Sequence, residues 1–540
     1  MSFLEATTER SPGAESVPTA GHQNHAYADS FLLAGLTTAA AALRFLFLTR
    51  KSFWFDEGVS VQIARLDWYN FARLLWRREA NMSLYYLLLR GWLHLGHSEF
   101  FVRSLSVLAA IAAVPAIYWL ARQLFDRRVA LIAATLLSVN AYHIRYAQEA
   151  RSYSLFVFMA IVSSGCLVSS IQRPSCRNRM SHIVATSSSV YVHFFAGLLV
   201  LAQWLSLRFL DPGLVTSNLK SRWAKHWRWI TGLSSPALLF AATTGVGPLS
   251  WIQRPTPGVL FSYYDHMAGN GGWVLLLAYF AACLIAIAPV RQEIVRRVAG
   301  WRVWRYQFLL LWLFLPVLVT IMVSLVRPMF VPRYFVFCLP AFILLTAAGI
   351  ARIRRTALLM LVMTFFVGFS VNGVASYYHQ DFDLERDDWR AASNYILDNL
   401  ASGDAILFHI AMGRMPFCFY QSLYRSGTHR AAIIYPGRSD RIDYRDFLGK
   451  PQKSLLLSVP ARYDRVWVVL EHNQNKSGEP DFTTLLLSQI FGMNYLHRQD
   501  RFFPGIEVRL YSDRNRSITR PSAQPEYPSA AGASVPIVGR

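Results

Sequence analysis

Apolar runs of about 20 residues recur along the chain, separated by short polar or basic segments. An α-helix needs an apolar run of this length to cross a hydrocarbon core about 30 Å thick. The pattern therefore predicts a polytopic α-helical membrane protein. We expect transmembrane helices near residues 30–48, 100–121, 128–143, 153–171, 229–246, 271–290, 306–326, 334–351 and 356–373.

Residues 181–207 form a stretch that is long for one helix and short for two. Lys and Arg concentrate in cytoplasmic loops, and the segments on both sides of this stretch are basic, so an even number of crossings should separate them. Two short helices that turn near His193 satisfy this condition and bring the total to about 11 transmembrane helices. A single re-entrant or tilted helix is the alternative.

The same charge rule orients the chain. The side opposite the basic loops is extracytoplasmic and carries an outer loop, residues 50–98, together with the C-terminal part of the chain. Arg50 and Lys51 are an exception because they lie on the outer end of the first span, so either they serve a function there or the topology is inverted. The loops predicted to be cytoplasmic are residues 122–128, 173–179, 208–228, 291–305 and 352–355.

The C-terminal part of the chain loses the long apolar runs. Residues 387–400 have a helical period, 405–409 and 465–470 read as buried strands, and 508–511 as a closing strand. This alternation predicts an extracytoplasmic α/β domain. The resulting domain boundaries are a disordered leader at 1–28, a transmembrane domain at 29–375, the soluble domain at 376–512 and a disordered tail at 513–540.

Composition supports a membrane protein and argues against a nucleic-acid partner. Hydrophobic residues make up 54% of the chain and charged residues only 16%, whereas soluble domains carry about 25% charged residues. The net charge of +22 is spread over short segments between the apolar runs instead of forming one stripe. The 5 cysteines have no paired spacing, so neither a disulfide framework nor a zinc site is indicated.

Two adjacent carboxylates, Asp56 and Glu57, follow three aromatic residues just outside the first span. Carboxylates beside a low-dielectric surface have raised pKa values and are suited to take a proton from a hydroxyl group. A solvated turn beside interfacial aromatics is the alternative interpretation.

Arginines gather on the same outer side, at Arg145, Arg151, Arg327 and Arg333. Guanidinium groups bind phosphate oxygens in a planar, bidentate manner, so this pattern predicts a phosphate-bearing ligand at the outer membrane surface. Alternatively, these side chains extend toward lipid headgroups. His193 approaches the same rim, although a lone histidine is more often a packing residue.

Several segments, taken in order and spacing, resemble the GT-C superfamily of membrane glycosyltransferases, within it the bacterial family 39 or protein-mannosyltransferase-like group. The resemblance covers roughly residues 30–400. The segments that carry it are FWFDEGVS (53–60), NMSLYYLLL (81–89), SEFFVRSLS (98–106), ARQLF (121–125), RYAQEARSY (145–153), YVHFF (191–195), PRY (332–334) and LPA (339–341).

This resemblance implies an inverting transferase that moves a sugar from a polyprenyl-phosphate carrier to a hydroxyl-bearing acceptor, in a bacterial inner (plasma) membrane with its active site extracytoplasmic. Asp56 would act as the catalytic base, with Glu57 supporting it. The donor phosphate would bind Arg333 and Arg151, with Arg145 and Arg327 as further candidates. Possible substrate contacts are His193, Tyr85, Tyr86, Gln148, Glu149 and Tyr334.

The chain departs from the family at Asn81-Met82-Ser83, where relatives often have a Pro-Pro pair, sometimes preceded by Lys. A donor contact from a lysine is therefore not expected there. Some members use a divalent metal, but no cluster in this sequence demands one.

A transporter or flippase of lipid-linked saccharides would also need many spans and arginines near phosphate. A membrane scaffold is a third class, but it leaves the acids and arginines unexplained.

Overall fold

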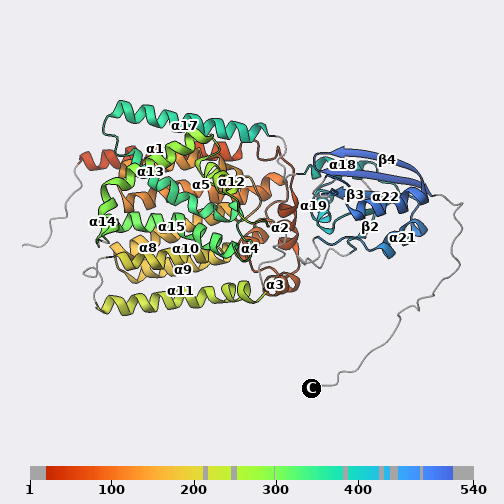
Figure 1. Ribbon diagram of the computed structural model, residues 1–540, viewed down its shortest axis with the longest axis horizontal. Coiled ribbons are helices and arrows are strands. Elements are labelled where there is room, and N and C mark those ends of the chain that lie inside the picture. The colour runs from red at the N-terminus through yellow and green to blue at the C-terminus, as the bar shows by residue number, and fades with distance from the viewer. Residues whose placement is uncertain are drawn as a thin grey trace, which may run out of the picture.

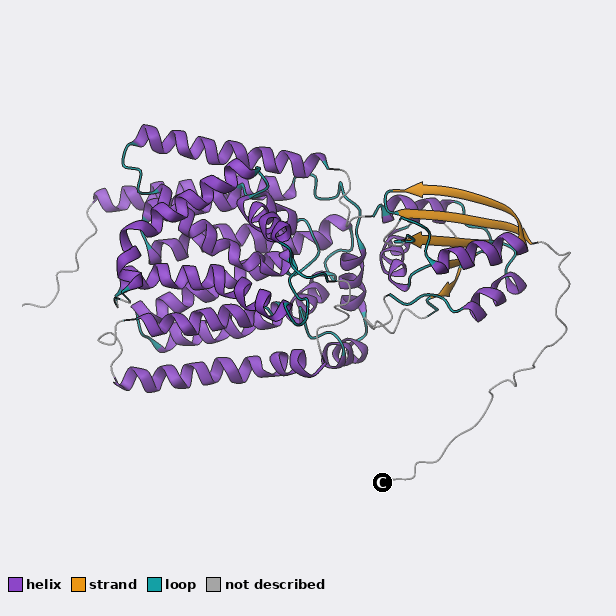
Figure 2. Ribbon diagram, viewed as in Figure 1, coloured by secondary structure: helices purple, strands orange, loops and turns teal. Residues whose placement is uncertain are grey.

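The computed structural model describes residues 20–210, 217–244, 252–296, 298, 300–380, 387–424, 431–437, 448–474 and 478–514. Long helices form one bundle, short helices cross one end of it, and a domain of helices and strands lies beyond that end (Figure 1). We call this end of the bundle the site end. The described strands all lie in the C-terminal domain (Figure 2). The predicted architecture, a helical membrane part followed by an α/β domain, is confirmed.

A helix occupies each position at which the apolar runs predicted a span. Among the described residues, six helical segments are long and apolar enough to cross a membrane, so the chain is an integral membrane protein. The total of about 11 crossings stays a prediction. The bundle consists of α1 (Ala20–Phe45), α5 (Glu99–Leu124), α6 (Arg127–Ser138), α8 (Tyr153–Gln172), α9 (Cys176–Val192), α10 (Ala196–Ser206), α11 (Ser217–Thr244), α13 (Trp273–Ile287), α15 (Trp301–Ser324), α16 (Leu339–Ile350) and α17 (Thr356–His379).

The remaining elements of the membrane part are short. Among them, α2, α3 and α4 lie across the site end (Figure 1). Their bounds are α2 (Phe55–Arg65), α3 (Trp68–Arg77), α4 (Ser83–Trp92), α7 (Ala141–Ala147), α12 (Pro257–Ala268) and α14 (Arg291–Val295), with 3-10 helices η1 (Leu207–Phe209), η3 (Ala288–Val290) and η4 (Pro332–Cys338).

Helices in the bundle approach closely where one of them carries glycine. A Cβ atom added at Gly349 of α16 would lie 1.9 Å from the backbone oxygen of Ala282 in α13, and small residues allow such contacts between membrane helices. On the outside of the bundle, large apolar side chains such as Leu284, Leu318 and Leu361 are exposed. They are the surface that lipid would cover.

The predicted leader is too long. Helix α1 begins at Ala20 instead of after residue 28, and residues 1–19 lie outside the described residues. Asp29 accepts a hydrogen bond from Tyr118 (3.1 Å) and forms an ion pair with Arg127, which ties the start of α1 to α5 and α6. This tertiary contact was not visible in the polar composition of the leader.

The predicted hairpin over residues 181–207 is present. Helices α9 and α10 are separated by a turn at His193, as proposed. His182 near the start of α9 and Gln203 near the end of α10 form a hydrogen bond (3.2 Å), so the two helices run antiparallel. The turn therefore lies at one end of the pair and this hydrogen bond near the other.

The C-terminal domain contains a mixed sheet with the strand order β2-β1-β3-β5-β4. Strand β1 pairs in parallel with β2 and β3, whereas β5 is antiparallel to β3 and β4. The three predicted strands correspond to β1, β3 and β5. The elements are α18 (Trp389–Asp398), β1 (Ala405–Phe408), η5 (Ala411–Gly413), α19 (Arg414–Leu423), β2 (Ala432–Tyr435), α21 (Lys453–Arg462), β3 (Val466–Glu471), α22 (Phe482–Asn494), β4 (Tyr495–Phe503) and β5 (Ile506–Arg514).

The C-terminal domain packs directly on the outer loop. The Phe53 ring stacks on Phe419 of α19, with ring centroids 4.2 Å apart, and the Phe53 N–H donates to the Tyr420 hydroxyl (2.6 Å). A Cβ atom at Gly58 of α2 would lie 2.8 Å from the backbone nitrogen of Pro416, so the two helices touch. Phe53, for which an interfacial position was one of two interpretations of the sequence, is therefore a docking residue for this domain.

Candidate active site

Asp56 lies in the first turn of α2 at the site end. A helix N-terminus favours a negative charge there. Its side chain is 18% exposed, and its Oδ2 atom lies 3.6 Å from Nη2 of Arg151, whose side chain is 12% exposed. Arg151 also donates to the backbone oxygen of Asp56 (3.5 Å) and to the Ser60 hydroxyl (3.4 Å). The structure thus brings together an accessible acid and a guanidinium group that lie 95 positions apart.

Glu57 has a different environment from its neighbour. It is fully buried, and its carboxylate forms a two-point ion pair with Arg103, through Nε to Oε1 (2.8 Å) and Nη2 to Oε2 (2.7 Å). Oε1 also accepts the N–H of Ala150 (2.8 Å). Because residue 150 precedes Arg151 and residue 57 follows Asp56, this contact fixes the segment of Arg151 beside the segment of Asp56.

Arg103 extends this anchor to the end of the first span. Its remaining N–H groups donate to the backbone oxygens of Leu48 and Lys51 (both 2.8 Å) and Ser52 (3.1 Å). Lys51, which departed from the charge rule, is buried with its Nζ 4.4 Å from the ring centroid of Tyr377. A packing role in the loop therefore accounts for its position on this side.

Arg333, in η4, reaches the same end of the bundle. Its guanidinium carbon lies 5.5 Å from the ring centroid of Trp54, two residues before Asp56, and 5.9 Å from that of Tyr334. The Tyr153 and Tyr334 hydroxyls are both within electrostatic range of Asp56 and of Arg333. Segments near residues 56, 151 and 333 therefore meet at the site end, as the sequence analysis expected.

The other two candidate arginines are placed differently. Nε of Arg145 lies 3.9 Å from Oε1 of Glu149, one helical turn away, so these two candidates face each other. Arg327 is exposed beyond the end of α15, and in the described part of the chain its side chain has no hydrogen bond or ion pair. Arg327 is therefore not part of the group formed by Asp56, Arg151 and Arg333.

His193 packs among aromatic rings next to this group. Its ring is parallel to Phe156 (centroids 5.1 Å apart, 7°) and lies 5.2 Å from that of Tyr334. Its Nδ1 atom accepts the N–H of Phe195 (3.2 Å). The turn between α9 and α10 is thereby held against η4, the segment that presents Arg333.

The remaining substrate candidates, Tyr85, Gln148 and Tyr86, differ in their hydrogen bonds to other residues of the protein. The Tyr85 hydroxyl hydrogen-bonds Ser106 (2.9 Å), and Gln148 donates to the backbone oxygen of Leu46 (2.7 Å), so both hold neighbouring segments together. Tyr86 is also buried, but its hydroxyl is within electrostatic range of Asp56. Tyr85 is likewise within electrostatic range of Glu57 and Arg151, so both tyrosines lie close to the catalytic candidates.

Glu79 is a candidate that the sequence analysis missed. It is 4% exposed, and its Oε2 atom has no hydrogen-bond partner among the described residues. Burial raises its pKa well above the usual range, the charge of Arg151 opposes this, and the charge of Asp56 adds to it. In the sequence it follows two arginines and resembles a solvated charge run, so no local signal distinguishes it.

The described residues contain one group of three side chains that could ligate a metal, and it includes none of the acids near Arg151. Its members are Asp387, Glu471 and His472. No cofactor site is therefore assigned to the surroundings of Asp56.

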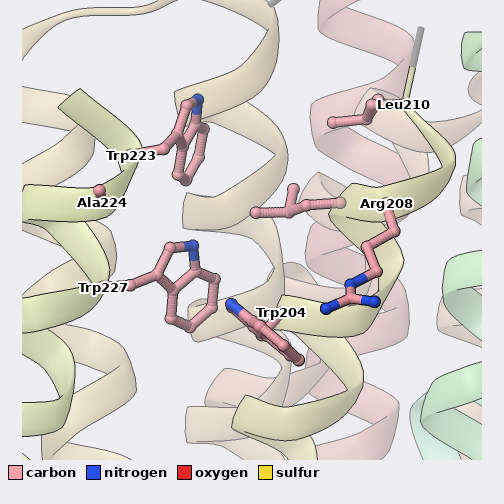
Figure 3. Close-up of a pocket in the computed structure, with 7 residues that line it drawn as sticks. Trp204, Arg208, Leu210, Trp223, Ala224 and Trp227 are labelled. Carbon is pink, nitrogen blue, oxygen red and sulfur yellow. The ribbon is translucent and has the colours of Figure 1, made fainter. Parts of the chain in front are cut away.

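A separate pocket of about 300 Å³ lies between α10 and α11 (Figure 3). The Arg208 guanidinium carbon is 4.9 Å from the Trp204 ring centroid. Trp223 and Trp227 of α11 line the other side of the pocket. This pocket is at the end of α10 opposite the His193 turn, and none of the residues that line it is a carboxylate. It is therefore not the site assembled around Asp56.

No family model matches the sequence, and no curated protein matches it either. Solved structures do resemble the chain. ArnT from Cupriavidus metallidurans in the apo state has a TM-score of 0.58 at 12% identity, over 89% of this chain and 98% of ArnT. The same protein bound to undecaprenyl phosphate gives 0.57 at 12% identity, over 88% and 97% of the two chains.

The Archaeoglobus fulgidus oligosaccharyltransferase, in complex with Zn and sulfate, gives a TM-score of 0.52 at 11% identity, over 89% of this chain and 73% of the other. AglB of the same organism, with an inhibitory peptide and a dolichol-phosphate, gives 0.50 at 11% identity, over 82% and 69% of the two chains. Identities this low establish the fold and nothing finer. The chain therefore shares its fold with ArnT and with the archaeal oligosaccharyltransferase.

Proposed function

We propose that this protein is an inverting glycosyltransferase that moves a sugar from a polyprenyl-phosphate carrier to a hydroxyl group of a glycan, lipid or protein at the extracytoplasmic face of the membrane. The observation that carries the proposal is the accessible carboxylate of Asp56, 3.6 Å from the Arg151 guanidinium, with Arg333 reaching the same end of the bundle. Complexes of similar structures with undecaprenyl phosphate and with dolichol-phosphate support a lipid-linked donor.

Asp56 is the proposed general base. Its carboxylate accepts the proton of the acceptor hydroxyl as the hydroxyl oxygen forms a bond to the anomeric carbon and the bond from that carbon to the lipid phosphate breaks. A single displacement of this kind inverts the anomeric configuration. The sugar leaves on the acceptor, and polyprenyl phosphate is the released product.

Arg151 and Arg333 are the proposed partners of the leaving phosphate. Negative charge grows on the phosphate as the glycosidic bond breaks, and fixed guanidinium groups stabilise that charge without reorganising. Burial raises the pKa of Glu79 and so favours its neutral form, in which the two arginines outweigh the single charge of Asp56. The site therefore keeps a positive charge for an anionic lipid.

Glu57 is proposed as a positioning residue, because both of its carboxylate oxygens are engaged by Arg103. Tyr86, His193 and Tyr334 remain proposed substrate contacts beside the phosphate site. Arg145 and Glu149 face each other and are proposed only as secondary contacts.

A turnover assay in detergent tests the proposed function and separates it from transport. A flippase needs two compartments, whereas a transferase converts a labelled polyprenyl-phosphate sugar and acceptor into product without them. We expect product from the wild type and a rise in KM for the donor of about tenfold or more in Arg333→Ala, since hydrogen bonds to charged groups contribute about 1.5–3 kcal/mol.

The matched variant is Arg327→Ala, which removes an exposed guanidinium six positions away in sequence. Its donor KM should stay within about twofold of the wild-type value, as for most surface substitutions. Equal effects of the two variants would contradict the phosphate assignment. The transporter would be favoured by two results together. The folded protein would turn over none of several polyprenyl-phosphate sugars, and it would move them across the membrane of vesicles.

Glu79 gives the proposed site a dependence on pH. Its protonated form, favoured by the raised pKa, adds no negative charge beside Arg151, whereas ionisation at higher pH adds one. Donor affinity should therefore fall as pH rises through the pKa of Glu79. Glu79→Gln keeps the neutral form at every pH, so its donor KM should stay flat over the range in which the wild-type KM rises. Parallel pH profiles for the two proteins would remove this role.

A further inference from the structure

A second group of acidic side chains lies where the C-terminal domain joins the membrane part. Asp387 precedes α18, Glu471 is the last residue of β3, and His472 follows it. One ligand atom from each of the three side chains lies within 4.8 Å of the other two. These residues come from two segments that are 84 positions apart in the numbering, so the fold and not the local sequence assembles them.

Two carboxylates in this group are buried together, and His472 Nε2 lies 3.8 Å from Oε1 of Glu471. Glu471 is 2% exposed and Asp387 6%. The Glu471 carboxylate lies beside Asp387 and Trp389 but forms no hydrogen bond of standard geometry, and no Lys or Arg forms an ion pair with either acid, in the part of the chain that the structure describes. An unpartnered buried carboxylate costs free energy unless a cation or a proton neutralises it. Accordingly, burial raises the pKa of both groups.

The backbone around the group leaves space for Asp387. Gly505, in the turn between β4 and β5, has φ of +71°, and a Cβ atom there would lie 1.7 Å from Oδ1 of Asp387. The side chain of His472 is 58% exposed, while that of Glu471 is 3% exposed. The group is thus closed by protein on the Glu471 side and reached from solvent on the His472 side.

We propose that Asp387, Glu471 and His472 form a binding site for a divalent cation of the Zn²⁺ or Mn²⁺ class. Two carboxylates and one imidazole are a donor set that such ions accept, with water completing the coordination on the exposed side. The cation neutralises both buried acids. This site is independent of the proposed transferase chemistry.

The cation links the C-terminal domain to the outer loop through Asp387. The backbone oxygen of Asp387 accepts the hydroxyl of Ser52 (2.6 Å), and the backbone oxygen of Ser52 accepts Nη2 of Arg103 (3.1 Å), the partner of Glu57. Binding of the ion therefore fixes the end of β3 to the segment that anchors α2. Its measurable consequence is a metal-dependent stability of the whole protein.

The test uses the full chain without an affinity tag, purified in detergent and stripped with a chelator. After equilibration with Zn²⁺ and removal of free metal, elemental analysis should find about one equivalent in the wild type and none above background in Glu471→Gln. Zn²⁺ should also raise the thermal midpoint of the wild type by several degrees but leave that of Glu471→Gln unchanged. Gln replaces one of two crowded buried charges by a neutral isostere, so this variant is expected to fold without metal.

Two histidine variants supply a second test of the cation site and its control. His472→Ala changes a largely exposed side chain and should weaken Zn²⁺ binding by about tenfold or more. His497→Ala removes a comparably exposed histidine, 72% exposed and next to Asp513 instead of this group, and should leave the affinity within about twofold. Wild type without bound Zn²⁺ or Mn²⁺, or the same stoichiometry and affinity in all four proteins, would overturn the site and leave two carboxyls that share a proton.

Discussion

Replacing Asp56 by Asn should lower the rate of sugar transfer by about 10²–10⁴-fold, the range that a positioned general base contributes. Asn has the same shape and fits the first turn of α2, but its amide cannot accept the proton of the acceptor hydroxyl. Donor binding should change little, because Arg151 and Arg333 remain. The measurement is the transfer rate at saturating donor, together with donor KM and the thermal midpoint of the purified variant.

Asp67→Asn is the matched control for this experiment. Asp67 lies in the same outer loop, is exposed, and accepts the Asn70 N–H (3.0 Å) as the cap of α3. Asn caps a helix about as well as Asp, so this variant loses one carboxylate without losing the cap. Its transfer rate should stay close to that of the wild type. Full transfer by Asp56→Asn would remove Asp56 as the base.

The spans could be predicted from the sequence because the length of an apolar run is a local property. Helices α5, α8 and α17 fall within a few residues of the predicted positions. The hairpin at residues 181–207 could be predicted only with an additional argument, that an even number of crossings must separate two basic loops on the same side of the membrane. His193 lies at its turn, as predicted. Two helices begin earlier than predicted. Helix α1 begins at Ala20, where its first turns are held by contacts with α5 and α6, and α11 begins at Ser217, inside the basic segment that was predicted to be a loop.

Strands of the C-terminal domain were found only where they are buried. Every residue of β1 and β3 is buried, which gives the short apolar runs that the sequence shows. Strand β4 is exposed along most of its length and has no such run. Strand β2 is only partly buried, and its short apolar run, Ala432–Tyr435, was not recognised as a strand. The missed strands are the two edges of the sheet, where one side faces solvent.

The residues of the candidate site could be predicted from the sequence only in part. Outer-loop position and residue type drew attention to Asp56, Arg151 and Arg333, and these do meet at the site end. Position and residue type alone did not separate Asp56 from Glu57, and only the family resemblance assigned Asp56 as the base. Adjacent residues on a helix point about 100° apart, and the fold decides which one reaches solvent. The partner of Glu57 is 46 positions away.

Glu57→Gln should destabilise the folded protein by about 3–5 kcal/mol, the cost of leaving one member of a buried ion pair without its partner. Arg103 is 1% exposed, so its charge has no access to water once the carboxylate is gone. The readout is the shift of the thermal midpoint in detergent. Glu99→Gln is the control. Glu99 is also buried, but its partner Arg390 has a side chain that is 35% exposed, so the guanidinium left behind keeps access to water and the loss of stability should be smaller than in Glu57→Gln.

The same variant separates positioning from catalysis. Because Glu57 also accepts the Ala150 N–H beside Arg151, its loss lets the Arg151 segment shift relative to Asp56, and a displacement of about 1 Å can lower a rate by about 10²-fold. Below the temperature of unfolding, Glu57→Gln should therefore transfer sugar more slowly but with the pH profile of the wild type, since Asp56 is still the base. A variant that is as stable as the wild type and has lost the acidic limb of that profile, where the rate rises as the base ionises, would instead place Glu57 in direct contact with the reacting hydroxyl.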